Sequence, residues 1–338
     1  MGIIVYRKPG IYCLFRSIVF YKGFGKDFKR VGFVEMEILY SIDKFSCTIV
    51  IAETGSGKTT RISSKFCQFP SLNFFFFPLE IPQFLLEAGY TMNNKCIAIS
   101  LPRRMAAISV ATRVSHELDC VLGSEVGYHI RFEDKSNART LIKYLTDGIL
   151  IKEMLQDPLL SRYSVIMIDD IHERTSNSDI LLGLLKKIRN KRPELKLIVS
   201  SATLDAEKIE RYFNNSDKKL ESNVLYIEGR VFPVDIYYLS QNCKNYIAET
   251  AKLAWGIHCS KKEGDILIFL TGQEEIEMVC SLLSMKYDTE VKQKKFAGFK
   301  IKICPLYANL PMENQMEIFD ETPKNTSFFH FFRNFGGY

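Results

Sequence analysis

The chain has 338 residues, which suggests about two domains, and its apolar fraction of 46% is sufficient for α/β cores. The net charge of +6 permits nucleic-acid binding without requiring it, and no apolar run is long enough to span a membrane, so we expect no membrane partner. The nine cysteines are scattered singly, which argues against zinc and a disulfide framework and favours a reducing compartment.

Residues 1–26 carry five basic side chains and no acidic one. Such a composition is also found in transit peptides, but this segment is not serine-rich and shows no clear amphipathic period. We therefore expect residues 1–35 to form a poorly ordered N-terminal extension.

The next element is a strand over 48–51 that runs into Ala52-Glu-Thr-Gly-Ser-Gly-Lys-Thr-Thr60. A buried strand, a glycine-rich turn and a helix together form a cradle for phosphates, because backbone N–H groups and the helix N-terminus favour an anion. In this pattern Lys58 contacts the β- and γ-phosphates, and the Thr59 hydroxyl binds Mg²⁺. Ala52 stands where the strict pattern has glycine, so the turn must begin in an ordinary conformation.

The stretch 61–80 interrupts the helix expected after this turn. It is rich in phenylalanine, and its prolines at 70 and 78 would break a helix. Two interpretations remain open, a natural surface insertion and the translation of a retained intron.

Strands and helices then alternate, which predicts a parallel sheet with helices on both faces. The expected elements of this first lobe are helix 81–88, strand 96–100, helix 103–118, strand 141–145, helix 147–156, strand 165–169, helix 178–190, strand 196–200, helix 205–213 and strand 223–227. A linker over 229–233 leads to a second lobe with strand 234–238, helix 245–259, strand 265–270, helix 273–286, strand 300–305 and helix 312–320.

An acidic pair, Asp169 and Asp170, ends the strand over 165–169. The carboxyl ends of parallel strands face the ligand crevice of an open α/β sheet. There Asp169 can hold Mg²⁺ through water, and Asp170 can orient an attacking water.

Together these segments resemble the DEAH-box RNA helicases of superfamily 2, and most closely the spliceosome-associated members. The resemblance covers about 36–60 and 81–327. Its motifs are Glu53–Thr60 (I), Pro102–Ala107 (Ia), Thr146–Leu150 (Ib), Asp169–His172 (II), Ser201–Thr203 (III) and Phe269–Ile276 (IV). Asp170 and Ile171 depart from the family, which has Glu and Ala there, and Leu101 replaces a Gln of motif Ia.

The resemblance implies an α/β fold of tandem RecA-like parallel sheets, ATP and Mg²⁺ as cofactors, and ATP-driven 3′-to-5′ movement on single-stranded RNA. It also implies the nucleus, with the cytoplasm as the alternative, and spliceosomal or activator proteins as partners in pre-mRNA splicing.

The resemblance assigns roles to individual residues. The expected catalytic residues are Lys58, Thr59, Asp169, Asp170 and His172, of which Thr59 and Asp169 hold Mg²⁺. The expected nucleotide-binding residues are Glu53, Thr54, Gly55, Ser56, Gly57, Lys58, Thr59, Thr60 and Arg113, although a solvated helix face is the alternative for Arg113. Ser201, Ala202 and Thr203 would couple the ATP state to lobe closure. RNA would be held by its backbone, without sequence specificity, by Arg103, Arg104, Arg131, Phe132, Thr146, Asp147, Gly148, Thr271 and Gly272.

The expected domains are the extension 1–35, the first RecA-like lobe 36–229 with its insertion 61–80, a partial second lobe 230–327, and an unrelated tail 328–338. The family would supply motifs V and VI where this tail stands, so the second lobe is expected to be incomplete and the activity impaired. Two alternatives remain, a catalytically inactive nucleotide-dependent RNA-binding scaffold and an aberrant gene-model product.

Overall fold

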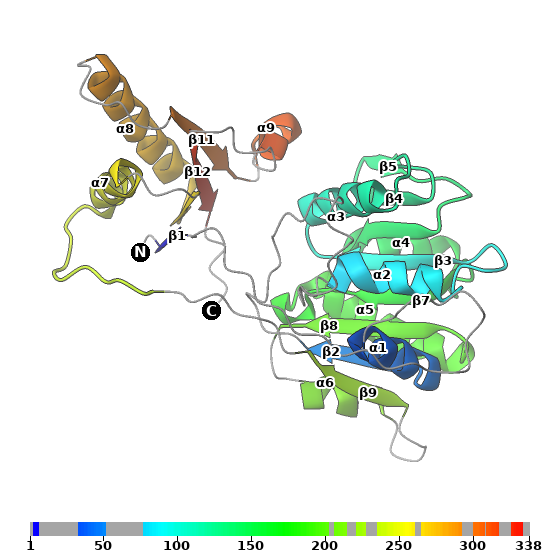
Figure 1. Ribbon diagram of the computed structural model, residues 1–338. Coiled ribbons are helices and arrows are strands. Elements are labelled where there is room, and N and C mark those ends of the chain that lie inside the picture. Colours follow the sequence, from blue (N-terminus) through cyan, green and yellow to red (C-terminus); the bar gives the residue numbers. More distant parts are fainter. Residues whose placement is uncertain are drawn as a thin grey trace. The chain divides into compact units, whose positions relative to one another are not determined.

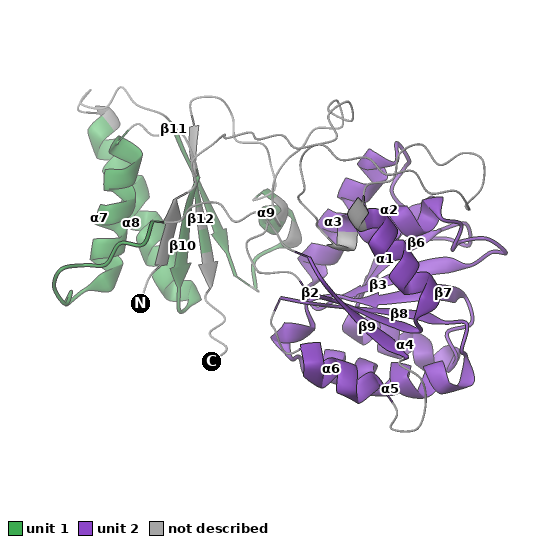
Figure 2. Cartoon of the chain, turned by 60° about the horizontal axis from the view of Figure 1, so that its bottom comes forward, with its two compact units in different colours: residues 1–13, 235–338 green, residues 14–234 purple. Residues whose placement is uncertain are grey.

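The chain is described by a computed structural model over residues 3–6, 33–51, 77–202, 206–214, 221–227, 235–260, 265–292, 300–307, 309–317 and 326–333. It divides into two compact units, which Figure 2 colours separately. The larger unit comprises Leu14–Val234, and the smaller unit comprises Met1–Cys13 with Asp235–Tyr338.

Within its described residues, the larger unit is built on an eight-stranded sheet in the order β5-β4-β6-β3-β7-β8-β2-β9 (Figure 1). All neighbouring strands are parallel except β4 and β5. The strands are β2 (Cys47–Ile51), β3 (Cys96–Leu101), β4 (Val126–Ile130), β5 (Glu133–Lys135), β6 (Ile142–Thr146), β7 (Tyr163–Ile168), β8 (Lys196–Ser201) and β9 (Ser222–Tyr226).

Helices cover both faces of this sheet (Figure 2). One face carries α1 (Phe33–Lys44), α2 (Phe77–Glu87) and α3 (Arg104–Glu117), and the other carries α4 (Asp147–Gln156), α5 (Ser176–Lys191) and α6 (Ala206–Phe213). Because both faces are covered, the central strands are continuous apolar runs, and every residue of β2 and β3 is buried. The α/β class with helices on both faces is thereby confirmed.

The smaller unit holds a four-stranded sheet in the order β1-β10-β12-β11. β10 and β11 are parallel to β12, and β1 is antiparallel to β10. Its elements are β1 (Ile3–Tyr6), α7 (Tyr246–Cys259), β10 (Ile266–Leu270), α8 (Gln273–Lys292), β11 (Lys300–Leu306), α9 (Met312–Met316) and β12 (Thr326–Arg333). Trp255, Ile268, Phe329 and Phe331 lie in its core.

Two segments outside the expected lobes contribute strands, and one expected strand is absent from the described residues; the expected linker 229–233 lies outside them. Residues 3–6 of the expected poorly ordered extension form β1, which pairs antiparallel with β10. The expected unrelated tail contributes β12, because Phe329 and Phe331 alternate into the core. Residues 235–238 are not a strand, and Tyr237 is 87% exposed; β10 already pairs with β1 and β12.

Further differences concern the larger unit. The hairpin of β4 and β5 was not predicted, and α1 begins at Phe33, inside the expected extension. Helix α2 begins at Phe77, so the last residues of the insertion 61–80 belong to its first turn.

Residues 61–76 lie outside the described part, as do 318–320 of the helix expected over 312–320. Within the described part, no helix has both the length and the apolarity needed to cross a membrane.

Candidate functional site

Four strand ends meet at one edge of the large sheet. β6, β3, β7 and β8 are neighbours in this order and run parallel, so their carboxyl ends lie together. The residues that follow them are those of the predicted motifs Ib, Ia, II and III. This edge is where open α/β sheets bind their ligands.

Asp169 is fixed at this edge by the two strands beside it. Its backbone N–H donates to the carbonyl oxygen of Ser100, the β3 neighbour, at 2.9 Å. The hydroxyl of Ser200, on β8, donates to Asp169 Oδ1 at 2.5 Å. Asp169 is only 6% exposed, so the carboxylate has a fixed position and one oxygen already engaged.

Asp170 turns the chain away from the strand. Its φ of +52° and ψ of 38° are left-handed, a conformation that Asp adopts more readily than most residues. It precedes a short 3₁₀ helix, η2 (Ile171–Glu173), whose Ile171 is buried in the core between the sheet and α4–α6. The backbone N–H of Glu173 donates to the Asp170 carbonyl oxygen at 3.0 Å. The turn therefore depends on backbone geometry as well as on side chains.

His172 links motif II to motif III. The backbone N–H of Ala202 donates to His172 Nδ1 at 3.3 Å, so Nδ1 acts as an acceptor. Asp170 Oδ1 lies 3.9 Å from the same nitrogen. Ser201, at the end of β8, is buried at 3% exposure, and Thr203 lies outside the described residues.

Glu173, the residue directly after motif II, pairs with motif Ia. Its Oε1 lies 2.7 Å from Arg103 Nη2, and the Arg103 side chain is 66% exposed. The next residue, Arg174, makes a two-pronged pair with Asp179 at 2.9 and 3.0 Å. The segment after β7 thus contacts the segments after β3 and β8.

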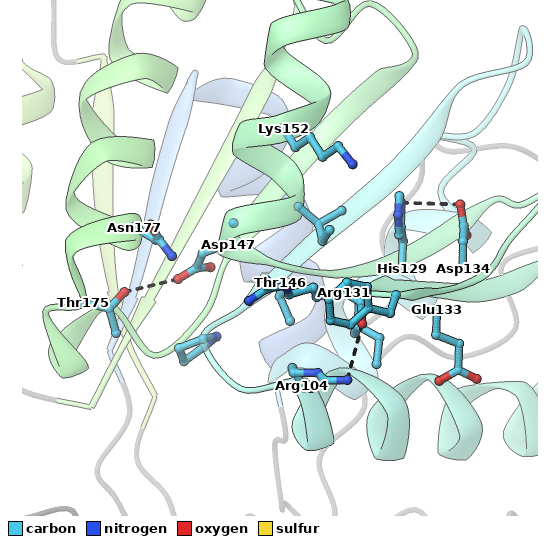
Figure 3. A pocket seen from close by; sticks show the side chains of 15 residues that line it. Arg104, His129, Arg131, Glu133, Asp134, Thr146, Asp147, Lys152, Thr175 and Asn177 are labelled. Carbon is cyan, nitrogen blue, oxygen red and sulfur yellow. Dashed lines mark hydrogen bonds and ion pairs between the residues drawn. The ribbon is translucent and has the colours of Figure 1, made fainter. Parts of the chain in front are cut away.

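A pocket of about 890 Å³ opens beside these motifs, between the start of α4, the start of α3 and the β4–β5 hairpin (Figure 3). Its polar lining comes from Arg104, His129, Arg131, Glu133, Asp134, Thr146, Asp147, Lys152, Thr175 and Asn177.

The hairpin side of the pocket combines a cation with an aromatic ring. Arg104 Nη2 donates to the Arg131 carbonyl oxygen at 3.3 Å, and the Arg131 guanidinium lies 4.8 Å from the centre of the Phe132 ring. Phe132 is 88% exposed and has a left-handed φ of +72°. An exposed ring at a strained turn, beside arginines, is a suitable surface for stacking a nucleobase.

The carboxylate of Asp147 differs from the expectation of a direct RNA contact. Asp147 is 3% exposed, and Ser100 Oγ donates to its Oδ1 at 2.5 Å. Thr175 Oγ1 donates to its Oδ2 at 3.5 Å (Figure 3). Burial raises the pKa of Asp147, and the two hydroxyls oppose this rise. The carboxylate is therefore used inside the protein.

The motif I residues Glu53, Thr54, Gly55, Ser56, Gly57, Lys58, Thr59 and Thr60 lie outside the described residues. The strand before them ends at the same edge as the other motifs, because Ile51 of β2 stands opposite Ser201 of β8 in a parallel pair. The chain therefore enters motif I next to motif III.

Two further predicted sites lie elsewhere. Arg113 is on α3, where its Nε lies 2.6 Å from Glu117 Oε1, and Gln83 Nε2 donates to Glu117 Oε2 at 2.8 Å. Thr271 and Gly272 follow β10 in the smaller unit, where the Thr271 backbone N–H donates to Glu275 Oε2 at 3.1 Å.

Sequence reasoning missed Ser100, Ser200 and Thr175, which hold the two buried carboxylates, and Lys152 and Asn177 of the pocket. A serine near the carboxyl end of an otherwise apolar strand is the signal that could have found the first two. Among the described residues, no group of three or more His, Cys, Asp or Glu side chains could hold a metal ion by itself.

Comparisons with known proteins agree with this geometry. The family model "DEAD/DEAH box helicase" matches residues 35–212, just over half of the chain. The human "Probable ATP-dependent RNA helicase DHX35" is 43% identical over 295 residues, which cover 85% of this chain and 39% of that protein. Its Caenorhabditis elegans homologue is 42% identical over 300 residues, covering 86% and 37%. This chain therefore spans less than two-fifths of these relatives.

Among solved structures, the Escherichia coli DEAH/RHA helicase HrpB matches with a TM-score of 0.69 and 26% identity, over 88% of this chain and 34% of that one. The likeness confirms the predicted RecA-like fold. With the matched family model and the relatives, it shows that this chain belongs to the DEAD/DEAH box helicase family.

Proposed function

We propose that this chain is the core of an ATP-dependent RNA helicase, which binds ATP and single-stranded RNA and couples ATP hydrolysis to RNA remodelling. The observation that carries the proposal is the joining of four motifs at one sheet edge. Motif II contacts motif III through His172 and Ala202, and the residue directly after motif II, Glu173, pairs with Arg103 of motif Ia. An edge connected in this way can report the state of one ligand to the other.

ATP would lie against motif I and the carboxyl ends of β2, β7 and β8, with Lys58 on its phosphates. The fixed carboxylate of Asp169 is the kind of oxygen ligand that Mg²⁺ takes, usually from one or two carboxylates together with phosphate oxygens and water. Thr59 would be the second protein ligand. Bound Mg²⁺ would neutralise charge on the phosphates, while Asp170 orients water and His172, with Ser201–Thr203, senses the nucleotide. Arg113 would lie against the adenine.

RNA would lie along the pocket in Figure 3. Support comes from its arginines and from the exposed ring of Phe132. Thr146, Gly148 and Arg103 would contact the backbone from the same side. Within the smaller unit, Thr271 and Gly272 after β10 are proposed as RNA-backbone contacts of their own. Contacts to sugar and phosphate give binding without sequence specificity.

Turnover would be low, because Asp170 is one methylene shorter than the family's Glu. This withdraws the carboxylate by about 1.5 Å, and a displacement near 1 Å can cost about 10²-fold in rate. This residue also favours the second candidate function, a nucleotide-dependent RNA-binding scaffold without catalysis. ATP hydrolysis by the purified chain, above the level of a Lys58→Ala variant, would exclude the scaffold.

The setting we propose is pre-mRNA splicing in the nucleus, with spliceosomal or activator proteins as partners. Support comes from the motif resemblance and from the cysteines, since all those described are free. Crosslinking of the tagged chain in nuclear extract should recover intron-containing RNA. Recovery of spliced cytoplasmic RNA alone would contradict this setting.

The test of the function is titration calorimetry with ATP and Mg²⁺. Lys58→Ala should remove most of the nucleotide affinity, because it deletes the cation on the β- and γ-phosphates. Lys187→Ala, an exposed lysine on α5, is the matched control and should bind as the unsubstituted chain does. Equal affinity of the two variants would refute the proposed nucleotide site.

A second titration follows RNA affinity against salt concentration. Arg131→Ala should reduce the magnitude of the slope of log K against log salt by about 0.7, the value for one phosphate contact on a single strand. An unchanged slope would remove Arg131 from the RNA site.

A further inference from the structure

Asp147 is a buried acid, and direct binding to RNA does not explain why its carboxylate is buried. It is 3% exposed, and it stands at the start of α4, between two predicted RNA contacts, Thr146 and Gly148. A carboxylate repels the phosphates that its neighbours would hold. Keeping such a group away from water is costly unless it is paired or hydrogen-bonded.

The two carboxylate oxygens reach two different segments. Oδ1 accepts from Ser100, at the end of β3 and just before motif Ia, at 2.5 Å. Oδ2 accepts from Thr175, which follows motif II, at 3.5 Å. Each oxygen therefore connects the start of α4 to a segment that continues into another motif.

Thr175 is itself fixed in the chain. It is the N-cap of α5, and its Oγ1 accepts from the backbone N–H of Ser178 at 3.1 Å. It lies three residues after His172. A displacement of the segment after motif II would therefore change the contact between Thr175 and Asp147, and with it the position of the first turn of α4.

We propose that Asp147 is a positioning residue that couples the nucleotide site to the RNA pocket by holding the start of α4 between β3 and the motif II segment. The inference rests on the proposed function, and it assigns the Asp147 side chain to coupling and not to RNA contact. Its signature is the ratio of RNA affinities with and without nucleotide. A direct contact would lower both affinities, whereas a coupling residue changes their ratio.

The experiment uses the full chain and a fluorescent single-stranded oligoribonucleotide, whose Kd is measured by anisotropy with and without a non-hydrolysable ATP analogue and Mg²⁺. We expect the unsubstituted chain to give a ratio of about fivefold or more, the usual range of such coupling. Asp147→Asn should bring the ratio to within about twofold of one while changing the nucleotide-free Kd by less than about threefold.

Two further variants make the result decisive. Asp157→Asn is the matched control, since Asp157 closes the other end of α4 and accepts from the Ser161 backbone N–H at 2.6 Å; it should keep the ratio. Ser100→Ala removes only the Oδ1 bond and should also lower the ratio, and it decides the matter if Asp147→Asn does not fold.

The outcomes separate the inference from the function on which it rests. An unchanged ratio in Asp147→Asn and Ser100→Ala overturns the inference, as does an equal loss of RNA affinity in both nucleotide states, which would indicate direct contact. If the unsubstituted chain binds both ligands with a ratio of one, only the inference fails. If it binds neither ligand, the proposed function fails as well.

Discussion

Replacing Phe331 with Ala tests whether β12 belongs to the core of the smaller unit. The Phe331 side chain is fully buried, and its residue stands opposite Ile268 of β10 on one side and Pro305 of β11 on the other. Removing the ring leaves a cavity in a core that also contains Trp255. The segment has no resemblance to the family, so its packing is the only reason to include it in the fold.

The expected loss is large for a unit of this size. Phe-to-Ala changes in cores cost about 3–5 kcal/mol, against a total stability of about 5–15 kcal/mol for a typical domain. Each kcal/mol lowers Tm by about 4–8 °C in a domain of 60–100 residues, so we expect a fall of more than about 10 °C. Scanning calorimetry of the full chain should show this fall in one transition, while the transition of the larger unit stays in place.

The matched control is Tyr237→Ala, in the same unit. Its ring is 87% exposed, so the change should stay within about 0.5 kcal/mol. If Phe331→Ala is as silent as Tyr237→Ala, β12 is not part of the core, and the tail after residue 327 is the unrelated segment that the sequence predicted.

Three other predictions concern the larger unit. Asp170→Glu should raise ATP turnover, measured by phosphate release, because the longer side chain restores the reach of the carboxylate. Unchanged turnover would mean that Asp170 orients the attacking water as well as Glu does. Burial, followed by the charges of Glu117 and Glu35, raises the pKa of Glu80 from 4.5 to about 8, so this group stabilises the fold at low pH, and its contribution is lost as the pH rises toward 8. Urea unfolding between pH 5 and 8 gives the free energy of unfolding as a function of pH. Glu80→Gln should reduce the steepness of its fall with pH by up to about 1.4 kcal/mol per pH unit. Parallel curves for the variant and the unsubstituted chain would contradict the raised pKa of Glu80. Deleting 61–80 removes the first turn of α2, Phe77–Glu80, and joins Thr60 to Ile81. The deletion should raise Tm and ATP affinity, and a lower ATP affinity would show that the insertion is native.

The motif-bearing strands of the larger unit could be predicted to within about two residues. A strand covered on both faces is a continuous apolar run with turn or polar residues at its ends, as in β7 and β8. Helix α4 was predicted with both its ends, since Asp147 follows a strand and Asp157 precedes a proline. The motifs then followed from the spacing of these elements.

The hairpin of β4 and β5 was missed for a local reason. Its turn places Phe132 at a positive φ, where the usual signal would be glycine or asparagine. β4 also contains Gly127 and His129, which interrupt the apolar pattern of a strand. Because the hairpin forms one wall of the pocket, the shape of the predicted RNA site could not be obtained from sequence.

β1 and β12 could not be predicted, because the strands with which they pair are not identified by any local sequence pattern. The pairing of Ile3 with Phe269 joins residues far apart in the sequence, and no local pattern reports such a contact. The expected strand over 234–238 is wrong for the same reason: its residues suit a strand, but β1 and β12 already occupy both edges of β10. Propensity describes which residues suit a strand but not which strand takes a given edge.

The contacts between segments at the carboxyl edge of the large sheet differ in strength. The strong contacts fix the geometry of the edge, whereas the weak one involves a side chain that is available to bind a ligand. The pair of Arg103 with Glu173 is open to solvent on the Arg103 side, and such surface pairs contribute about 0–1 kcal/mol. The bonds from the Ser100 hydroxyl to Asp147 and from the Ser200 hydroxyl to Asp169 are short and charge-assisted, and such bonds contribute about 1.5–3 kcal/mol each. Substitutions at the buried links should therefore alter the geometry of the whole edge. Substitutions at the exposed pair should alter mainly what the edge binds, because little of the fold depends on it.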